Sequence, residues 1–265
     1  MRHTLSAALL LTLALSQAIT AQVVATSRTD ANSLQAHAEL MQKKSQGRID
    51  VYFEGDSITR RWGTSDSEYA DFLANWKQNF FGWNAADFGW GADTVQNILW
   101  RLEQGELSGV HPKVIVLLAG TNNVGDAVSA DKRDAVINEV SSGIHQILAL
   151  MQQQAPQATI LLTALTPRNG KQGETTVMPV IEAINQKLAA LADGKRIRFI
   201  TLNAQLADAS GKLREGMTVD GLHLSVRGYQ IWADALKPHL RELLGPPAGQ
   251  DHAPPPSSNP ASRKQ

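Results

Sequence analysis

Residues 113–120 read KVIVLLAG, and this stretch decides the fold class of the chain. Its apolar residues follow one another without polar alternation, which is typical of a strand buried on both faces of a parallel sheet. Gly120 ends the run where such a strand would turn toward a helix. Further strands are expected at 48–53, 84–88, 159–165 and 197–202.

Segments with helical periodicity separate these strands. Apolar residues recur every three or four positions within 95–102, 136–151, 180–191 and 229–243, which predicts one apolar stripe on each helix. Alternating strands and amphipathic helices predict an α/β domain whose parallel sheet of about five strands is covered by helices on both faces. In such a sheet the reactive groups gather beyond the carboxyl ends of the strands.

Composition and charge argue against several classes of protein. Hydrophobic residues make up 43% of the 265 residues, which is too many for a disordered chain. The 25 basic residues balance the 25 acidic ones, so the chain lacks the basic excess expected of a nucleic-acid-binding protein. There is no cysteine, which removes disulfides, thiolate metal ligands and cysteine nucleophiles. After residue 25 no stretch is apolar for long enough to span a membrane.

The N-terminal residues 1–21 are predicted to be a secretory signal peptide. A basic start, an apolar run of about 10–12 residues and small residues up to Ala21 form the usual pattern. Cleavage is expected after Ala21, with Ala18 as the alternative, and a buried N-terminal helix is the other interpretation. The mature protein would then be periplasmic or secreted.

The rest of the chain is expected to contain one domain and a tail. A lead-in helix is expected within 22–47, followed by the α/β domain at 48–245. Residues 246–265 hold six of the 11 prolines and no apolar side chain larger than alanine. Such a segment buries too little surface to offset the entropy of ordering, so we expect a disordered tail or a linker.

A serine and a histidine stand where this architecture would place reactive groups. Gly55-Asp56-Ser57 follows the first expected strand, so the Ser57 hydroxyl would be exposed at the reactive edge near a helix N-terminus. Asp220-Gly221-Leu222-His223 precedes the last expected helix, and an acid three residues before a histidine can orient its ring as a general base. Each motif alone is weak, since the first could be a simple turn and the second a helix cap.

Two further turns could stabilise a developing oxyanion. Gly120-Thr121-Asn122-Asn123 follows the central strand, and the Asn122 amide is a donor of the required type. Residues 88–94 form a glycine-rich turn that could offer a backbone N–H at the start of a helix. This turn could equally be a tight connection with a helix cap at Asp93 or Thr94.

Metal chemistry is not indicated. The sequence has no His-x-His or His-Glu-x-x-His, and Asp56, Asp93 and Asp220 have no clear second histidine beside them. The remaining histidines lie on expected helices, in the tail, in the leader or at the start of a strand, away from the reactive edge. We therefore expect neither a metal nor a cofactor.

Together these four motifs resemble the SGNH (GDSL-type) serine hydrolases. They occur in that family's order, and the resemblance covers about 48–245. It is nearest to the catalytic-subunit branch of the platelet-activating-factor acetylhydrolases, through FGWGADT at 88–94, LWRL at 99–102 and GTNN at 120–123. The resemblance implies a three-layer, flavodoxin-like fold and a serine esterase.

The resemblance also implies a role for each motif. Ser57 would be the nucleophile, His223 the general base and then acid, and Asp220 its orienting carboxylate. The oxyanion would be held by the N–H groups of Ser57 and Ala92 and by the Asn122 amide. The family has glycine where this chain has Ala92, so Gly91 is the alternative donor.

The substrate is expected to be a short-chain ester, above all an acetyl ester on a carbohydrate. The connections after the strands are short, and Trp62, Trp83 and Trp90 lie near them, where indole rings could stack on a sugar. Core packing is the competing interpretation of these three residues. A lipid or lysophospholipid ester is the alternative substrate. A non-catalytic carbohydrate- or surface-binding module is the alternative of a different class, and a metal-dependent phosphoesterase ranks third.

Overall fold

The computed structural model describes residues 22–173 and 176–264. Its centre is one sheet of five parallel strands in the order β2-β1-β3-β4-β5. The strands are β1 Val51–Gly55, β2 Ala85–Asp87, β3 Val114–Leu118, β4 Thr159–Thr163 and β5 Ile197–Ile200. This is the flavodoxin-like order, so the predicted fold class is confirmed.

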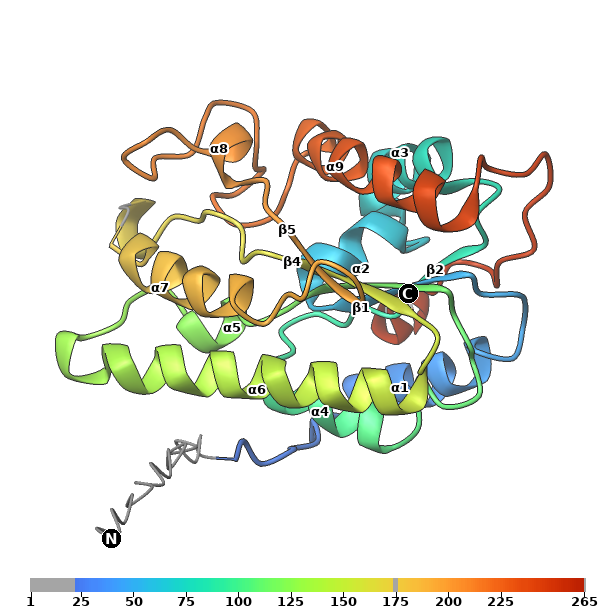
Figure 1. Ribbon diagram of the computed structural model, residues 1–265, viewed down its shortest axis with the longest axis horizontal. Coiled ribbons are helices and arrows are strands. Elements are labelled where there is room, and N and C mark those ends of the chain that lie inside the picture. Colours follow the sequence, from blue (N-terminus) through green and yellow to red (C-terminus); the bar gives the residue numbers. More distant parts are fainter. Residues whose placement is uncertain (1–21, 174–175, 265) are drawn as a thin grey trace, which may run out of the picture.

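Helices cover both faces of the sheet (Figure 1). One face carries α1 Ala31–Lys43, α4 Val95–Glu103, α6 Arg133–Gln154 and α7 Met178–Ala189. The other carries α2 Ser57–Gly63, α3 Ala70–Phe80 and α9 Val226–Leu244. Shorter elements lie in the connections: η1 Ser67–Tyr69, α5 Thr121–Val124, η2 Ala130–Lys132, η3 Lys171–Gly173, α8 Asn203–Leu206 and η4 Pro260–Lys264.

The central strands are apolar on both faces because they separate two cores. Ile115 and Leu117 of β3 pack toward α4, α6 and α7, whereas Val116 and Leu118 pack toward α2, α3 and α9. Side chains alternate between the faces of a strand, so a strand covered on both sides reads as an unbroken apolar run. This is the physical origin of the KVIVLLAG signal.

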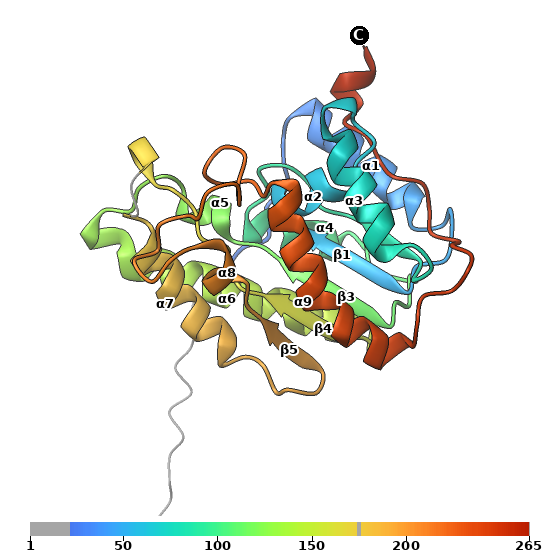
Figure 2. The same ribbon diagram turned by 90° about the horizontal axis from the view of Figure 1, so that it is seen from above.

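The C-terminal segment 246–264 corrects one expectation, because it is ordered rather than disordered. It runs back past α3 and ends beside α1 (Figure 2), where η4 packs against that helix. Three backbone hydrogen bonds of 2.8–2.9 Å join it to earlier parts of the chain: Ala248 to Gly82, Arg48 to His252, and Ser65 to Ser257.

Proline chemistry explains why this segment can be ordered without large apolar side chains. Each ring restricts the backbone in the unfolded state, so less conformational entropy is lost on docking. Pro254 and Pro260 are buried, and hydrogen bonds of the backbone and of side chains, together with an ion pair between Arg263 and Glu39, supply further contacts. The prediction of disorder rested on the lack of large apolar side chains, and this criterion does not detect a segment that is held by hydrogen bonds and proline rings.

The N-terminal predictions have different outcomes. The lead-in helix is present as α1, within the predicted 22–47. The predicted signal peptide, 1–21, lies outside the described residues. Within the part of the chain that the structure describes, no helix has the length and apolar character needed to cross a bilayer.

Candidate active site

Ser57 lies at the carboxyl end of β1, as the first residue of α2. Asp56 caps this helix, because its Oδ1 accepts a hydrogen bond of 2.9 Å from the Ile58 N–H. The strand before it must end in glycine, since a Cβ on Gly55 would lie 2.4 Å from the Leu118 carbonyl oxygen. This tight passage from strand to helix presents the Ser57 hydroxyl at the edge of the sheet.

His223 and Asp220 come from the loop before α9 and meet Ser57 across 166 residues of sequence. The distance from Ser57 Oγ to His223 Nε2 is 2.9 Å. On the other side of the ring, His223 Nδ1 lies 2.6 Å from Asp220 Oδ2. The arrangement fits an imidazole that donates through Nδ1 to the carboxylate and accepts the serine proton at Nε2.

The Asp220 carboxylate is oriented by its own loop. Its Oδ1 accepts hydrogen bonds from the N–H groups of His223, at 2.8 Å, and Leu222, at 3.1 Å. Burial alone would raise the pKa of Asp220, but these N–H groups and the imidazole hold that pKa below its usual range. The carboxylate therefore stays ionised and can stabilise an imidazolium.

The environment of His223 favours its neutral form. Burial lowers the pKa of His223 below its usual value. Asp220 opposes this shift, while the positive charges of Arg61 and Arg168 reinforce it. A neutral imidazole is the form that can accept a proton from a serine.

We therefore expect hydrolysis to rise with pH and to reach half of its maximum below about pH 6.5, the usual histidine pKa. Protonated His223 cannot act as a base, so activity is lost as the pH falls through its pKa. The measurement is kcat/KM for p-nitrophenyl acetate from pH 4.5 to 8 at constant ionic strength. Samples returned from each pH to pH 7 serve as the control for unfolding, and a midpoint above pH 6.5 would contradict the expected environment of the ring.

The turn after β2 lies beside Ser57. A Cβ on Gly91 would lie 4.0 Å from the Ser57 Cβ, so the backbone of this turn is next to the nucleophile. The turn is anchored to β1, because the Trp90 N–H donates to the Gly55 carbonyl at 3.0 Å. Asn122 is tied to the same turn by a 2.8 Å hydrogen bond from its Nδ2 to the Asp93 carbonyl. The structure thus gathers Ser57, the 91–92 turn and Asn122 at one edge.

Ala92 has a left-handed backbone conformation, with φ +63°. For a residue with a Cβ this conformation costs on the order of 1–2 kcal/mol, a cost that glycine avoids. The strain shows why glycine suits this position, while the alanine N–H remains available as a donor.

We expect Ala92→Gly to raise the free energy of unfolding by up to about 1 kcal/mol, because the strain is relieved and part of the gain is lost to the greater freedom of glycine in the unfolded chain. Urea unfolding of the wild type and the variant measures this change. Ala149→Gly, at an exposed site inside α6, is the matched control and should cost about 1 kcal/mol. Equal destabilisation by both changes would show that φ at residue 92 is not strained.

Two arginines near the site were not singled out by the sequence patterns. Arg61 lies one helical turn after Ser57, and its Nη1 is 3.5 Å from Asp220 Oδ2. Arg168 follows β4 and donates to the Thr121 carbonyl and hydroxyl oxygens at 3.3 Å, which fixes the start of the α5 turn that carries Asn122. The strand-end rule that drew attention to Asn122 would also have found Arg168, just beyond the 159–165 run.

The three tryptophans considered for sugar stacking are buried, which supports the packing interpretation. Trp62 is 0% exposed and stacks on Tyr229 and Trp232. Trp83 is 4% exposed and Trp90 is 8% exposed. None of the three leaves an indole face open for a ligand.

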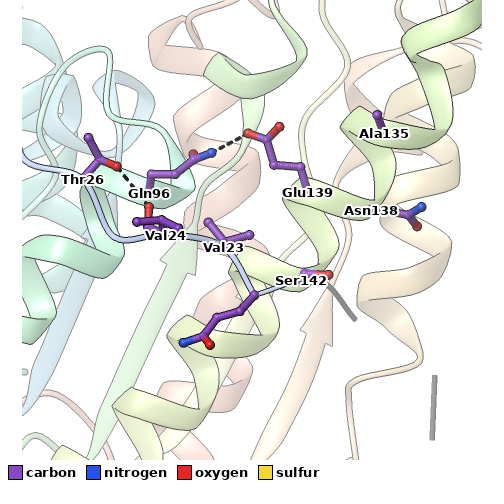
Figure 3. Close-up of a pocket in the computed structure, with 9 residues that line it drawn as sticks. Val23, Val24, Thr26, Gln96, Ala135, Asn138, Glu139 and Ser142 are labelled. Atoms are coloured by element: carbon purple, nitrogen blue, oxygen red, sulfur yellow. Dashed lines mark hydrogen bonds between the residues drawn. The ribbon is translucent and has the colours of Figure 1, made fainter. Parts of the chain in front are cut away.

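A separate hollow of about 550 Å³ lies away from these residues, between the extended segment at 22–26 and helices α4 and α6. Figure 3 shows it with the hydrogen bond between Gln96 and Glu139 at its rim. It includes none of the residues gathered around Ser57. Across residues 22–173 and 176–264, no three histidine or carboxylate side chains are grouped in a way that could hold a metal ion.

Comparison with known proteins identifies the family of this chain. The profile of the GDSL-like lipase/acylhydrolase family matches residues 53–231, from β1 into α9. The chain belongs to this family. It is an acylhydrolase that acts on ester bonds.

Individual relatives support the assignment. The chain is 30% identical to platelet-activating factor acetylhydrolase IB subunit alpha1 of Bos taurus, over 87% of this chain and 92% of that protein. A GDSL-like lipase from Bacteroides thetaiotaomicron has a similar fold, with a TM-score of 0.63 at 20% identity over 80% of this chain and 99% of the other. A family two carbohydrate esterase from Clostridium thermocellum shares the fold with a TM-score of 0.51 at 15% identity, over 76% of this chain and 65% of the other.

Proposed function

We propose that this GDSL-family acylhydrolase cleaves short-chain esters through a covalent acyl-serine formed on Ser57. The observation that carries the proposal is the hydrogen-bonded chain from Ser57 Oγ to His223 Nε2 and from His223 Nδ1 to Asp220. Such a chain supplies a nucleophile, a base matched to it and a group that holds the base in one tautomer.

The proposed reaction has two steps. Ser57 Oγ bonds to the ester carbonyl carbon as its proton passes to His223, and His223 then returns that proton to the departing alcohol. Water then attacks the carbonyl carbon of the acyl-serine and gives a proton to His223. His223 passes this proton to Ser57 Oγ as the bond between the acyl group and Ser57 breaks, and the carboxylic acid leaves. Asp220 stays ionised throughout and stabilises the imidazolium.

The carbonyl oxygen becomes negatively charged in both steps. We assign its stabilisation to the Ser57 and Ala92 N–H groups and the Asn122 amide, with Gly91 as the alternative to Ala92. The Asn122 Nδ2 already donates to the Asp93 carbonyl, so its amide is held in place before substrate binds.

For the substrate we propose an acetyl ester carried by a carbohydrate. Asp56 alone separates β1 from α2, and two residues separate β3 from α5, so these connections leave little surface to enclose a long acyl chain. The names of two similar proteins, an acetylhydrolase and a carbohydrate esterase, are consistent with this choice. The acetylhydrolase relatives also support an acetyl ester on a lipid as the second candidate.

Acetate release tests the choice between these substrates. We expect the purified protein to hydrolyse p-nitrophenyl acetate faster than the butyrate and octanoate esters, and to release acetate from acetylated xylo-oligosaccharides. The same assay on the 2-acetyl phospholipid platelet-activating factor tests the second candidate. Hydrolysis of the phospholipid but not of the oligosaccharides would show that the substrate is a lipid ester rather than a carbohydrate ester. Binding of an oligosaccharide without any hydrolysis would favour the non-catalytic binding module.

We propose further that the protein is exported after removal of residues 1–21, on the basis of their signal-peptide pattern. The test is the intact mass of the protein recovered from the periplasm or medium of a bacterial host. Cleavage after Ala21 predicts a chain that begins at Gln22, and a full-length chain confined to the cytoplasm would contradict export.

A further inference from the structure

A polar pocket of about 200 Å³ lies beside the candidate active site. Its walls come from four parts of the chain: the start of α1 with the residues just before it, helix α2, the turn after β2 and the C-terminal segment. Residues that form them include Arg28, Asn32, Arg60, Trp90, Gly91 and Asn259. We propose that this pocket is the subsite for the sugar ring whose acetyl ester is cleaved, an inference that rests on the proposed function.

The pocket adjoins the nucleophile through two of its walls. Arg60 lies three residues after Ser57 in α2, and residues at this spacing share one face of a helix. Gly91 borders both the pocket and Ser57, because a Cβ placed on it would lie 4.0 Å from the Ser57 Cβ. An ester bound at Ser57 can therefore extend its alcohol portion into this pocket.

The pocket offers fixed hydrogen-bond donors. Asn259 Oδ1 accepts from Asn32 Nδ2 at 2.9 Å and from the Ala261 N–H at 3.2 Å, which fixes the orientation of the amide. Its Nδ2 has no hydrogen-bond partner among residues 22–173 and 176–264. This N–H₂ group is free to donate to a ligand oxygen.

Arg60 contributes in a similar way. Its Nη2 pairs with Asp66, while its Nε and Nη1 have no partner in the described part of the chain. The guanidinium lies 5.0 Å from the centre of the Trp90 ring and covers it, so recognition here would use hydrogen bonds rather than aromatic stacking. Hydroxyl oxygens of a sugar are suitable acceptors for both donors.

Size and polarity favour one sugar ring over a lipid. Pockets for drug-sized ligands usually measure about 300–1,000 Å³, and this one is smaller. An acyl or alkyl chain would leave Asn259 Nδ2 and the Arg60 donors without partners after displacing water, which is unfavourable. A single hydroxyl-bearing ring meets both constraints.

The C-terminal segment completes this subsite. The Asn259 N–H donates to Asp66 Oδ1 at 2.8 Å, and Ser257 Oγ accepts from the Lys43 ammonium at 3.2 Å. These contacts hold Asn259 against α1 and against the connection between α2 and η1. The segment therefore supplies a wall of the substrate site, which a disordered tail could not do.

Two Asn259 variants test the proposal with mono-O-acetyl methyl glucosides as probes and p-nitrophenyl acetate as the reference ester. Asn259→Ala removes the whole amide, whereas Asn259→Asp keeps an Oδ1 acceptor for Asn32 and Ala261 but removes the free donor. For both we expect the ratio of the glucoside KM to the p-nitrophenyl acetate KM to rise roughly fivefold to tenfold, the effect of one lost hydrogen bond. Ser258→Ala, the neighbouring position outside the pocket, should leave the ratio at the wild-type value.

The outcomes separate the subsite from the proposed function. If the wild type releases acetate from the glucosides but neither Asn259 variant changes the KM ratio, the subsite is wrong and the proposed function stands. Equal losses on both esters would show a structural role for Asn259 and would also overturn the subsite. If the wild type hydrolyses p-nitrophenyl acetate but none of the glucosides, the carbohydrate substrate itself is wrong, and the subsite with it.

Discussion

Ser57→Ala is expected to lower kcat for p-nitrophenyl acetate by a factor of roughly 10⁴ to 10⁶, the usual loss when the nucleophile of such a triad is removed. Alanine lacks the oxygen that would attack the ester, and within residues 22–173 and 176–264 His223 Nε2 has no hydroxyl partner other than Ser57 Oγ, at 2.9 Å. The residual rate would come from the oxyanion donors and from binding. The measurement is the rate of p-nitrophenol release by wild type and variant purified in the same way.

Ser129→Ala is the matched control, since the Ser129 side chain is exposed and makes no capping hydrogen bond at the start of η2. It should retain the wild-type rate. The circular dichroism spectrum and melting temperature of Ser57→Ala should match those of the wild type, because Ser57 is a partly exposed side chain at a helix start. A Ser57→Ala enzyme with more than a few per cent of the wild-type kcat would exclude the acyl-serine route.

Arg101→Leu should lower the free energy of unfolding by about 3–5 kcal/mol, the usual cost of removing one partner from buried ion pairs. The Arg101 guanidinium is buried and contacts three carboxylates: Glu54 at 2.6 Å, Asp93 at 2.8 Å and Glu106 at 2.5 Å. Leucine would leave these carboxylates in the core without their shared cation. Because Asp93 adjoins Ala92, the change should also disturb the turn beside Ser57.

The pH dependence of the Arg101→Leu loss tests this explanation. Burial raises the pKa of Glu54 to about 8 and that of Asp93 to about 6, although Arg101 opposes both shifts. In Glu106, Arg101 and His37 outweigh burial and lower the pKa, so Glu106 carries the charge beside a protonated Glu54. The folded protein keeps a proton on Glu54 up to about pH 8, whereas the unfolded chain releases this proton above about pH 4.5. The free energy of unfolding therefore falls as the pH rises toward 8.

We therefore expect the wild type to be more stable at pH 5.5 than at pH 8, and the Arg101→Leu loss to be smaller at pH 5.5, where the carboxylates can be neutralised. Urea unfolding at the two pH values measures both effects. Arg133→Leu, at an exposed position at the start of α6, is the control and should change stability by less than about 0.5 kcal/mol.

Arg101→Lys is the second variant, in case Arg101→Leu does not accumulate as folded protein. Lysine keeps the charge but loses the forked contacts, so its free energy of unfolding should lie between those of the wild type and Arg101→Leu. A loss under 1 kcal/mol at pH 8 for Arg101→Leu would contradict the buried network.

Much of the architecture and the main residues of the candidate site could be predicted from local patterns. The run at 113–120 became β3 because a strand covered on both faces must be apolar throughout. Ser57 and Asn122 could be grouped because each follows a strand and the ends of parallel strands meet at one edge, whereas His223 could be added through its Asp-x-x-His motif and the family resemblance. These inferences depend on short segments and on one general rule of topology.

The C-terminal segment, the buried Arg101 network and the conformation of Ala92 required the tertiary structure. The C-terminal segment and the Arg101 network depend on partners far away in the sequence, such as Arg48 and Ser65 for the backbone of the segment and Glu54 for Arg101. Charge and proline content alone suggest solvent exposure, and only a folded surface with matching hydrogen-bond groups reverses that preference. The sequence by itself therefore determined the sheet, its helices and the residues at its reactive edge. The tertiary structure decided which polar groups are buried and where the last 19 described residues dock. Burial and docking could not be predicted from local patterns, because they are properties of contacts between distant segments.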